Sequence, residues 1–157
     1  MSKKLKISCI IVAILIVIWA IVIFLFSAEN GDESSQSSGI FTQLFMRIFF
    51  VEYSEWKMLI VEFYLRKAAH TFIFAVLGGL NALFFLHFTK NRYIVFSFST
   101  LLSLLYAISD EIHQGFVPER SASALDVCID TSGAILGIFI TIILVSAYKE
   151  YKIKNRR

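Results

Sequence analysis

The side chains of this chain that can carry charge or acid–base chemistry are gathered in three short stretches. They are Arg66, Lys67 and His70; Asp110, Glu111, His113 and Gln114; and Arg120, Asp126 and Asp130. Helical spacing sorts them by face, because residues three or four apart are neighbours on a helix. Arg66 then shares a face with His70, and Asp126 shares one with Asp130.

Two adjacent acids in the second stretch are expected to have different roles. Asp110 shares a helix face with His113 and Gln114, whereas Glu111 points about 100° away from Asp110. We therefore expect these two carboxylates to contact different neighbours.

Two kinds of chemistry fit these residue types. The basic side chains can hold a phosphate or a carboxylate through charge-assisted hydrogen bonds. The acids and imidazoles can serve as general acids and bases. All ten residues named above are therefore candidates for ligand binding. Four of them are candidate catalytic residues: Asp110, Glu111, His113 and His70. No serine stands in a nucleophile motif such as G-x-S-x-G.

A divalent metal is a further option, with Asp110, His113, Asp126 and Asp130 as its ligands. The spacing of these residues along the chain corresponds to no recognised metal motif. We therefore expect neither a metal nor a cofactor, and this expectation rests on spacing alone.

The elements that must position these residues are membrane helices. The chain has 157 residues, of which 57% are hydrophobic and 17% are charged. A soluble domain averages about 45–50% apolar and about 25% charged residues, so a soluble globular protein and a disordered one are both excluded. Four segments have the roughly 20 mostly apolar residues that a spanning helix needs. They lie at about 7–26, 68–88, 93–109 and 127–147.

We predict an all-α fold, with one membrane domain over residues 1–157 built as a four-helix bundle. Residues 40–64 carry apolar residues at helical spacing, interrupted by charges, and are predicted to form amphipathic helical structure in the outer interface. A re-entrant segment packed inside the bundle is the alternative. Gly133 and Gly137 form a small-xxx-small pair, where two helices can approach closely.

The distribution of lysine and arginine predicts which end faces the cytoplasm. With the N-terminus inside, ten basic residues lie on the cytoplasmic side and five lie outside, as the positive-inside rule requires. Both termini are then cytoplasmic, and the polar helix ends lie on the outer side. The basic tail is explained by topology and anionic lipid, so the net charge of +3 indicates no nucleic-acid partner.

The position of this cluster near the membrane favours a function. A charge at the bilayer centre costs about 2.5–3.5 kcal/mol, and ionisable residues within spans are commonly functional. The alternative is a network of ion pairs that only locks three helix ends together. In both cases we expect the groups inside the spans to pair with Arg66, Lys67 or Arg120. We also expect Arg66 or Arg120 to contact one of the acids of the cluster.

The pattern of these residues resembles the VanZ-like family of small bacterial membrane proteins. The residues that carry the resemblance are Arg66-Lys67-x-x-His70, then Asp110-Glu111-x-His113-Gln114-x-Phe116-x-Pro118-x-Arg120, then Asp126-x-x-x-Asp130-x-x-Gly133-x-x-x-Gly137. The resemblance covers about residues 10–147. Two positions depart from the family pattern: Asp130, where Asn is more common, and Glu119, where Gly is common.

The resemblance implies a multi-span protein of the bacterial cell membrane, and some members are associated with resistance to glycopeptide antibiotics such as teicoplanin. Two functions stay open. In the first, the polar site binds or shields a cell-envelope lipid, such as a lipid-linked cell-wall precursor, or a lipoglycopeptide. In the second, the protein is a membrane enzyme that acts on an envelope lipid or peptidoglycan precursor by acid–base chemistry. A transporter is less expected, because four spans are few for a monomer and no inverted repeat is visible. The oligomeric state is left open.

Overall fold

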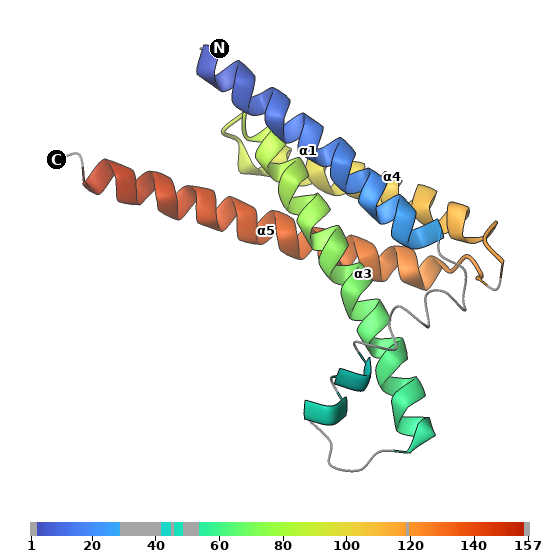
Figure 1. Ribbon diagram of the computed structural model, residues 1–157. Helices are drawn as coiled ribbons and strands as arrows, with labels where there is room; N and C mark the ends of the chain where they lie inside the picture. Colours follow the sequence, from blue (N-terminus) through green and yellow to red (C-terminus); the bar gives the residue numbers. More distant parts are fainter. Residues whose placement is uncertain (1–2, 29–41, 45, 49–53, 119, 156–157) are drawn as a thin grey trace.

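The computed structural model contains four long helices and one short helical segment in the part of the chain that it describes (Figure 1). The described residues are 3–28, 42–44, 46–48, 54–118 and 120–155. The long helices are α1 (Lys3–Ala28), α3 (Glu55–Phe85), α4 (Arg92–Gln114) and α5 (Ala124–Lys154). The short segment, α2, comprises residues 42–44 and 46–48. Each long helix is long and apolar enough to cross a membrane, which confirms the predicted all-α fold with four spans.

Helix α3 is longer than the span predicted from hydropathy. The prediction separates an interfacial segment, 40–64, from a span that begins near residue 68, but in the structure residues 55–67 belong to the same helix as the span. No glycine or proline interrupts the chain between Glu55 and Leu77, and Glu62 pairs with Arg66 one turn later at 3.0 Å. The 31 residues of α3 extend about 46 Å, against about 30 Å for a hydrocarbon core. Its first turns therefore project beyond the other helices (Figure 1).

Helices α3 and α5 pack backbone to backbone through glycine. Gly133 and Gly137 on α5 face the main chain of α3 at Thr71 and Ala75, and a Cβ at either glycine would overlap a carbonyl oxygen there. The sequence prediction of a close-packing pair at these positions is confirmed. This contact brings the first turns of α5 beside the middle of α3, where several of the candidate residues lie.

Two hydrogen bonds between side chain and backbone attach the middle of helix α1 to the bundle. The Trp19 indole donates to the carbonyl of Ile73 at 2.8 Å, and the Tyr106 hydroxyl donates to the carbonyl of Ala20 at 2.6 Å. Between these bonds lies a core of fully or almost fully buried residues from three helices: Ile23, Phe74, Leu77 and Ala107. Most other apolar side chains of α1 are exposed, as expected for a helix that faces lipid.

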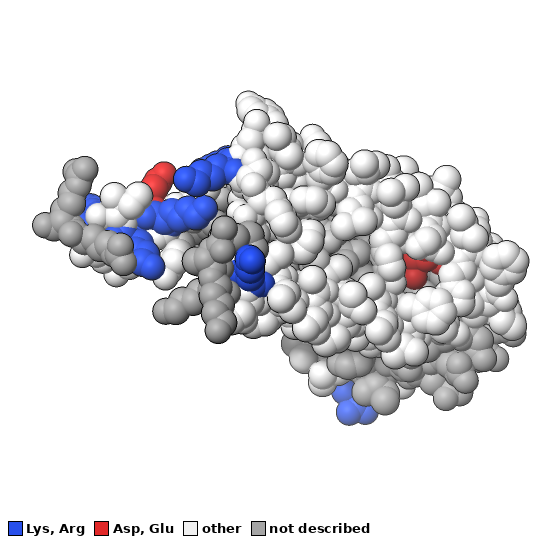
Figure 2. All heavy atoms as spheres, turned by 90° about the horizontal axis from the view of Figure 1, so that it is seen from above, with Lys and Arg blue, Asp and Glu red and all other residues white. Residues whose placement is uncertain are grey.

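The two ends of the bundle differ in their chain connections and charge. Both chain ends and the short turn between α3 and α4 lie at one end, and the connection from α4 to α5 lies at the other (Figure 1). At that turn the Asn91 side chain accepts hydrogen bonds from the backbone of Tyr93 and Ile94 and begins α4. On the face shown in Figure 2, Lys and Arg gather at the end with the termini, and most of the remaining surface is uncharged.

One departure from the family pattern, at Glu119, lies outside the described residues. The prediction for residues 40–64 is covered only in part, because 40, 41, 45 and 49–53 are not described.

Candidate functional site

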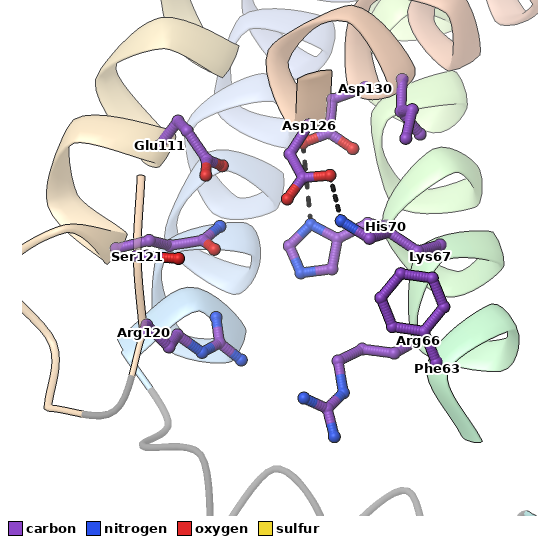
Figure 3. A pocket seen from close by; sticks show the side chains of 11 residues that line it. Phe63, Arg66, Lys67, His70, Glu111, Arg120, Ser121, Asp126 and Asp130 are labelled. Carbon is purple, nitrogen blue, oxygen red and sulfur yellow. Dashed lines mark hydrogen bonds and ion pairs between the residues drawn. The ribbon is translucent and has the colours of Figure 1, made fainter. Parts of the chain in front are cut away.

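A pocket of about 160 Å³ lies where α3, α4, α5 and the α4–α5 connection meet (Figure 3). We call it the helix-end pocket. It is lined by Phe63, Arg66, Lys67 and His70 of α3, by Glu111 and Gln114 of α4, by Arg120 and Ser121 of the connection, and by Asp126, Ile129 and Asp130 of α5. The α4–α5 connection, which lines the pocket, lies at the end of the bundle remote from the termini (Figure 1).

One face of α3 supplies the basic side of the pocket. Phe63, Arg66, Lys67 and His70 are spaced three, four and seven residues apart, so helical geometry places them in one stripe. The ammonium group of Lys67 lies 5.4 Å from the centre of the Phe63 ring, within the range of a cation–π contact. The guanidinium of Arg66 donates to Glu62 at 3.0 Å.

The first turns of α5 supply acids that face this stripe. Asp126 accepts a hydrogen bond from the Lys67 ammonium, and the Nδ1 atom of His70 lies 3.7 Å from Oδ2 of Asp130 (Figure 3). Asp130 is only 2% exposed, whereas Asp126 and Lys67 are partly exposed. The close α3–α5 packing at Gly133 positions these two pairs, because it holds the two helix faces together just beyond them.

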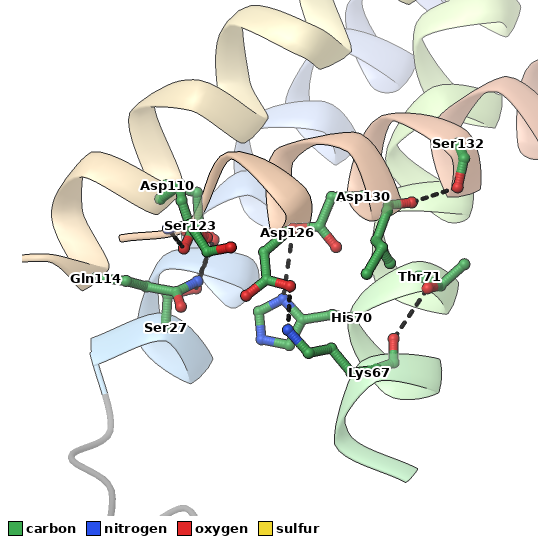
Figure 4. A network of polar contacts seen from close by, with 12 residues as sticks. Ser27, Lys67, His70, Thr71, Asp110, Gln114, Ser123, Asp126, Asp130 and Ser132 are labelled. Carbon is green, nitrogen blue, oxygen red and sulfur yellow. Dashed lines mark hydrogen bonds and ion pairs between the residues drawn. The ribbon is translucent and has the colours of Figure 1, made fainter. Parts of the chain in front are cut away.

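Asp110 lies behind Gln114 and connects α4 to the end of α1. Its Oδ2 atom accepts hydrogen bonds from the Ser27 hydroxyl at 2.8 Å and from the Gln114 amide at 3.0 Å (Figure 4). The backbone carbonyl of Ser27 in turn accepts from the Arg120 guanidinium at 3.2 Å. Asp110 is 3% exposed, and its Oδ1 atom has no hydrogen-bond partner among the described residues.

Glu111 connects α4 to the beginning of α5. Its Oε1 atom accepts a hydrogen bond from the backbone N–H of Ser123, the N-cap residue of α5, at 2.7 Å. A carboxylate at this place also interacts favourably with the positive end of the helix dipole. Glu111 and Asp110 therefore contact different neighbours.

Eight of the ten residues named from the sequence line the helix-end pocket. They are Arg66, Lys67, His70, Glu111, Gln114, Arg120, Asp126 and Asp130. Asp110 is connected to the pocket through Gln114. Asp126 pairs with Lys67, one of the three basic side chains expected to pair with the acids.

His113 is directed elsewhere. Its ring stacks on that of Phe24 in α1, with centroids 4.3 Å apart and planes 23° apart. Three residues along a helix turn through about 300°, so His113 lies about 60° around α4 from Asp110, on the side that α1 covers. In the structure, His113 therefore contributes to the packing of α1 against α4.

Sequence reasoning did not single out several residues of the site. Phe63 precedes Arg66 and Lys67 by three and four positions, so the helical stripe could have included it. Ile129 similarly precedes Asp130 within the first turns of α5. Ser27 gave no chemical signal, because a lone serine at the end of an apolar span is common; only the packing of α1 brings it to Asp110.

A group of possible metal ligands also comes together at this site. His70, Asp110 and Asp130 each present one nitrogen or oxygen atom within 4.8 Å of the others. This group differs from the set considered from spacing, because it includes His70 and omits His113 and Asp126.

The fold and the site together define a class of protein: a small helical membrane protein with a charged pocket at one end of its bundle. The chain belongs to the VanZ/LLP1 family, whose model matches residues 12–145. No curated protein and no solved structure matches the chain.

Proposed function

We propose that this protein binds the anionic headgroup of a cell-envelope lipid in the helix-end pocket, from the outer face of the bacterial membrane. The observation that carries the proposal is the position of Arg66 and Arg120. These side chains come from different elements, and their guanidinium groups lie on two sides of the same space (Figure 3). Two guanidinium groups that flank one space suit the planar, bidentate recognition of phosphate or carboxylate.

The size of the pocket favours a headgroup over a larger ligand. Pockets that take drug-sized molecules measure roughly 300–1,000 Å³. At about 160 Å³ the helix-end pocket has room for a phosphate-bearing group but not for a whole lipoglycopeptide. A lipid-linked cell-wall precursor presents a group of this size, since its phosphates lie at the membrane surface between a polar head and an apolar tail.

The apolar surface beside the pocket is suited to the tail of such a lipid. Phe63 lines the pocket and is 56% exposed, and Leu59 and Tyr64 on the same part of α3 are also exposed. This part of α3 projects beyond the other helices. An acyl or polyprenyl chain could lie along it while its headgroup occupies the pocket. Shielding of the precursor in this way would connect the site to glycopeptide resistance.

Lipid binding can be measured on the purified protein in phosphatidylcholine nanodiscs. The probe is a polyprenyl diphosphate, with phosphatidylglycerol as a simpler anionic lipid, and bound lipid is counted by native mass spectrometry. We expect saturable binding at one site, with at least tenfold weaker binding in Arg66→Gln and Arg120→Gln. A hydrogen bond to a charged group is typically worth about 1.5–3 kcal/mol, which corresponds to a loss of this size.

The matched control changes the same residue type at the opposite end of the bundle. Arg92→Gln should bind the probe within about twofold of the parent protein. Helix content by circular dichroism must be unchanged in all three variants. Equal weakening in Arg92→Gln, or equal binding of phosphatidylcholine and the diphosphate, would contradict the proposal.

An enzyme acting on the same lipid is the second candidate, and the pairing of His70 with Asp130 favours it. Asp130 lies by one ring nitrogen of His70, and the other ring nitrogen faces the pocket (Figure 3). An imidazole oriented by a buried carboxylate can draw a proton from a water molecule that attacks a phosphoanhydride. Release of inorganic phosphate from the polyprenyl diphosphate, abolished in His70→Gln while binding persists, would favour this candidate. Binding without release would exclude it for this substrate.

A further inference from the structure

The deepest polar group of the site is formed by one side chain from each of three helices. His70 comes from α3, Asp110 from α4 and Asp130 from α5, and one ligand atom of each lies within 4.8 Å of the other two. Asp110 and Asp130 are 3% and 2% exposed, and His70 is partly buried. Two carboxylates so close together in a buried place repel each other unless a positive charge lies between them.

The donor set suits a divalent cation. An imidazole with two carboxylates is a ligand set that Zn²⁺ and Mn²⁺ accept, whereas Mg²⁺ and Ca²⁺ prefer oxygen alone. Two ligands about 2.1 Å from one ion at the tetrahedral angle lie about 3.4 Å apart. The distance between His70 Nδ1 and Asp130 Oδ2 is 3.7 Å, close to this value, and Asp110 presents a ligand atom within 4.8 Å of one from each of the other two residues.

A second observation points to a missing partner in this group. The Oδ2 atom of Asp110 is oriented by the Ser27 hydroxyl and the Gln114 amide, both of which are uncharged. The Oδ1 atom is buried and has no hydrogen-bond partner among the described residues. Metal-ligating carboxylates are commonly held by hydrogen bonds of this kind to one oxygen. An ion bound through Oδ1 would satisfy this oxygen.

An ion held here would also be accessible. His70 and Asp130 line the helix-end pocket, while Asp110 closes the group from behind. Three protein ligands would leave at least one coordination position directed to the pocket, where water or an anionic oxygen can bind. We propose that His70, Asp110 and Asp130 form a binding site for one divalent cation of the Zn²⁺ and Mn²⁺ type.

The proposal is tested with the metal ion alone, so its outcome is independent of the lipid-binding proposal. The full chain, purified in detergent and stripped with a chelator, is dialysed against Zn²⁺, and bound metal is measured by mass spectrometry. We expect one Zn²⁺ per chain. The isosteric variants Asp110→Asn and Asp130→Asn should each bind at least tenfold more weakly, because each loses a charged ligand.

The matched control is Glu150→Gln, which neutralises an exposed acid near the other end of α5, away from the helix-end pocket. It should bind Zn²⁺ within about threefold of the parent protein. With Mn²⁺ as the probe, the electron spin resonance of the bound ion should show coupling to a nitrogen nucleus, and this coupling should vanish in His70→Gln. The proposal is overturned if the parent protein binds no stoichiometric metal, or if Glu150→Gln loses as much affinity as the other variants. Circular dichroism separates loss of metal from loss of fold.

Discussion

Asp110 and Glu111 are adjacent in the chain and both are almost fully buried, yet they connect different parts of the protein. Asp110 binds Ser27 and so joins α4 to α1, whereas Glu111 binds the backbone of Ser123 and so joins α4 to α5. Two neighbouring carboxylates thereby connect three helix ends. The site is for this reason also a structural junction, and a variant must be checked for fold before its function is judged.

The pair formed by Lys67 and Asp126 gives a prediction on stability. The two side chains are 29% and 25% exposed, so solvent screens them in part, and we expect a coupling energy of about 0.5–1 kcal/mol. A double-mutant cycle of Lys67→Gln and Asp126→Asn measures it through the free energy of unfolding in mixed micelles. The control cycle combines Asp126→Asn with Lys152→Gln at the other end of α5 and should show no coupling. An equal coupling energy in both cycles would show that the contact between Lys67 and Asp126 is not its cause.

Helical spacing predicted most residues of the pocket but not the direction of each side chain. The stripe on α3 and the pair on α5 follow from spacings of three and four, and they do face each other. His113 has the same kind of spacing from Asp110 but turns toward Phe24, because α1 covers that side of α4. The group of His70, Asp110 and Asp130 has no signature along the chain, since its members belong to three helices.

At the level of whole helices, hydropathy located the spans but not the ends of the helices. Charges at Lys57 and Glu62 lower the hydropathy of residues 55–67 and suggested a separate interfacial element. Hydropathy measures how well a segment fits lipid, whereas continuity of a helix depends on breakers, and none occurs between Glu55 and Leu77. A charged first section can therefore belong to the same helix as a span.

The close packing of α3 against α5 gives a prediction on one glycine. In Gly137→Val the new side chain would overlap the backbone of α3 at Ala75, so the helices would have to separate. We expect a loss of at least about 2 kcal/mol in the free energy of unfolding, or no folded protein. Ile140→Val places the same residue on a lipid-facing position of α5, 56% exposed, and should change the free energy by less than about 0.5 kcal/mol. If Gly137→Val lowered the free energy of unfolding as little as Ile140→Val does, the close contact at the glycine would not be needed for stability.

For the molecule as a whole, the two ends of the bundle carry different chemistry. One end holds the chain termini and a concentration of basic side chains (Figure 2), and the other holds the mixed acids and bases of the pocket. Each basic residue near anionic lipid contributes about 1 kcal/mol of attraction to the membrane surface. This attraction favours placing the end with the termini at the cytoplasmic surface, where anionic lipids are concentrated. The side of the membrane that holds the pocket has only five of the fifteen lysines and arginines, so the bias in basic residues favours the outside for it.

This difference predicts the orientation of the protein, and a pair of reporters can measure it. A green fluorescent protein fused after Arg157 should fluoresce, because it folds in the cytoplasm, and an alkaline phosphatase inserted near Ser37 should be active, because it folds outside. An inactive phosphatase together with a dark fusion would place the helix-end pocket on the cytoplasmic side. The lipid probe would then have to be supplied to the inner leaflet, and shielding of an external antibiotic target would no longer be a role for this pocket. Because three spans, an odd number, lie between Ser37 and Arg157, the two reporters must lie on opposite sides of the membrane. If both reported the same side, the four-span topology would be contradicted.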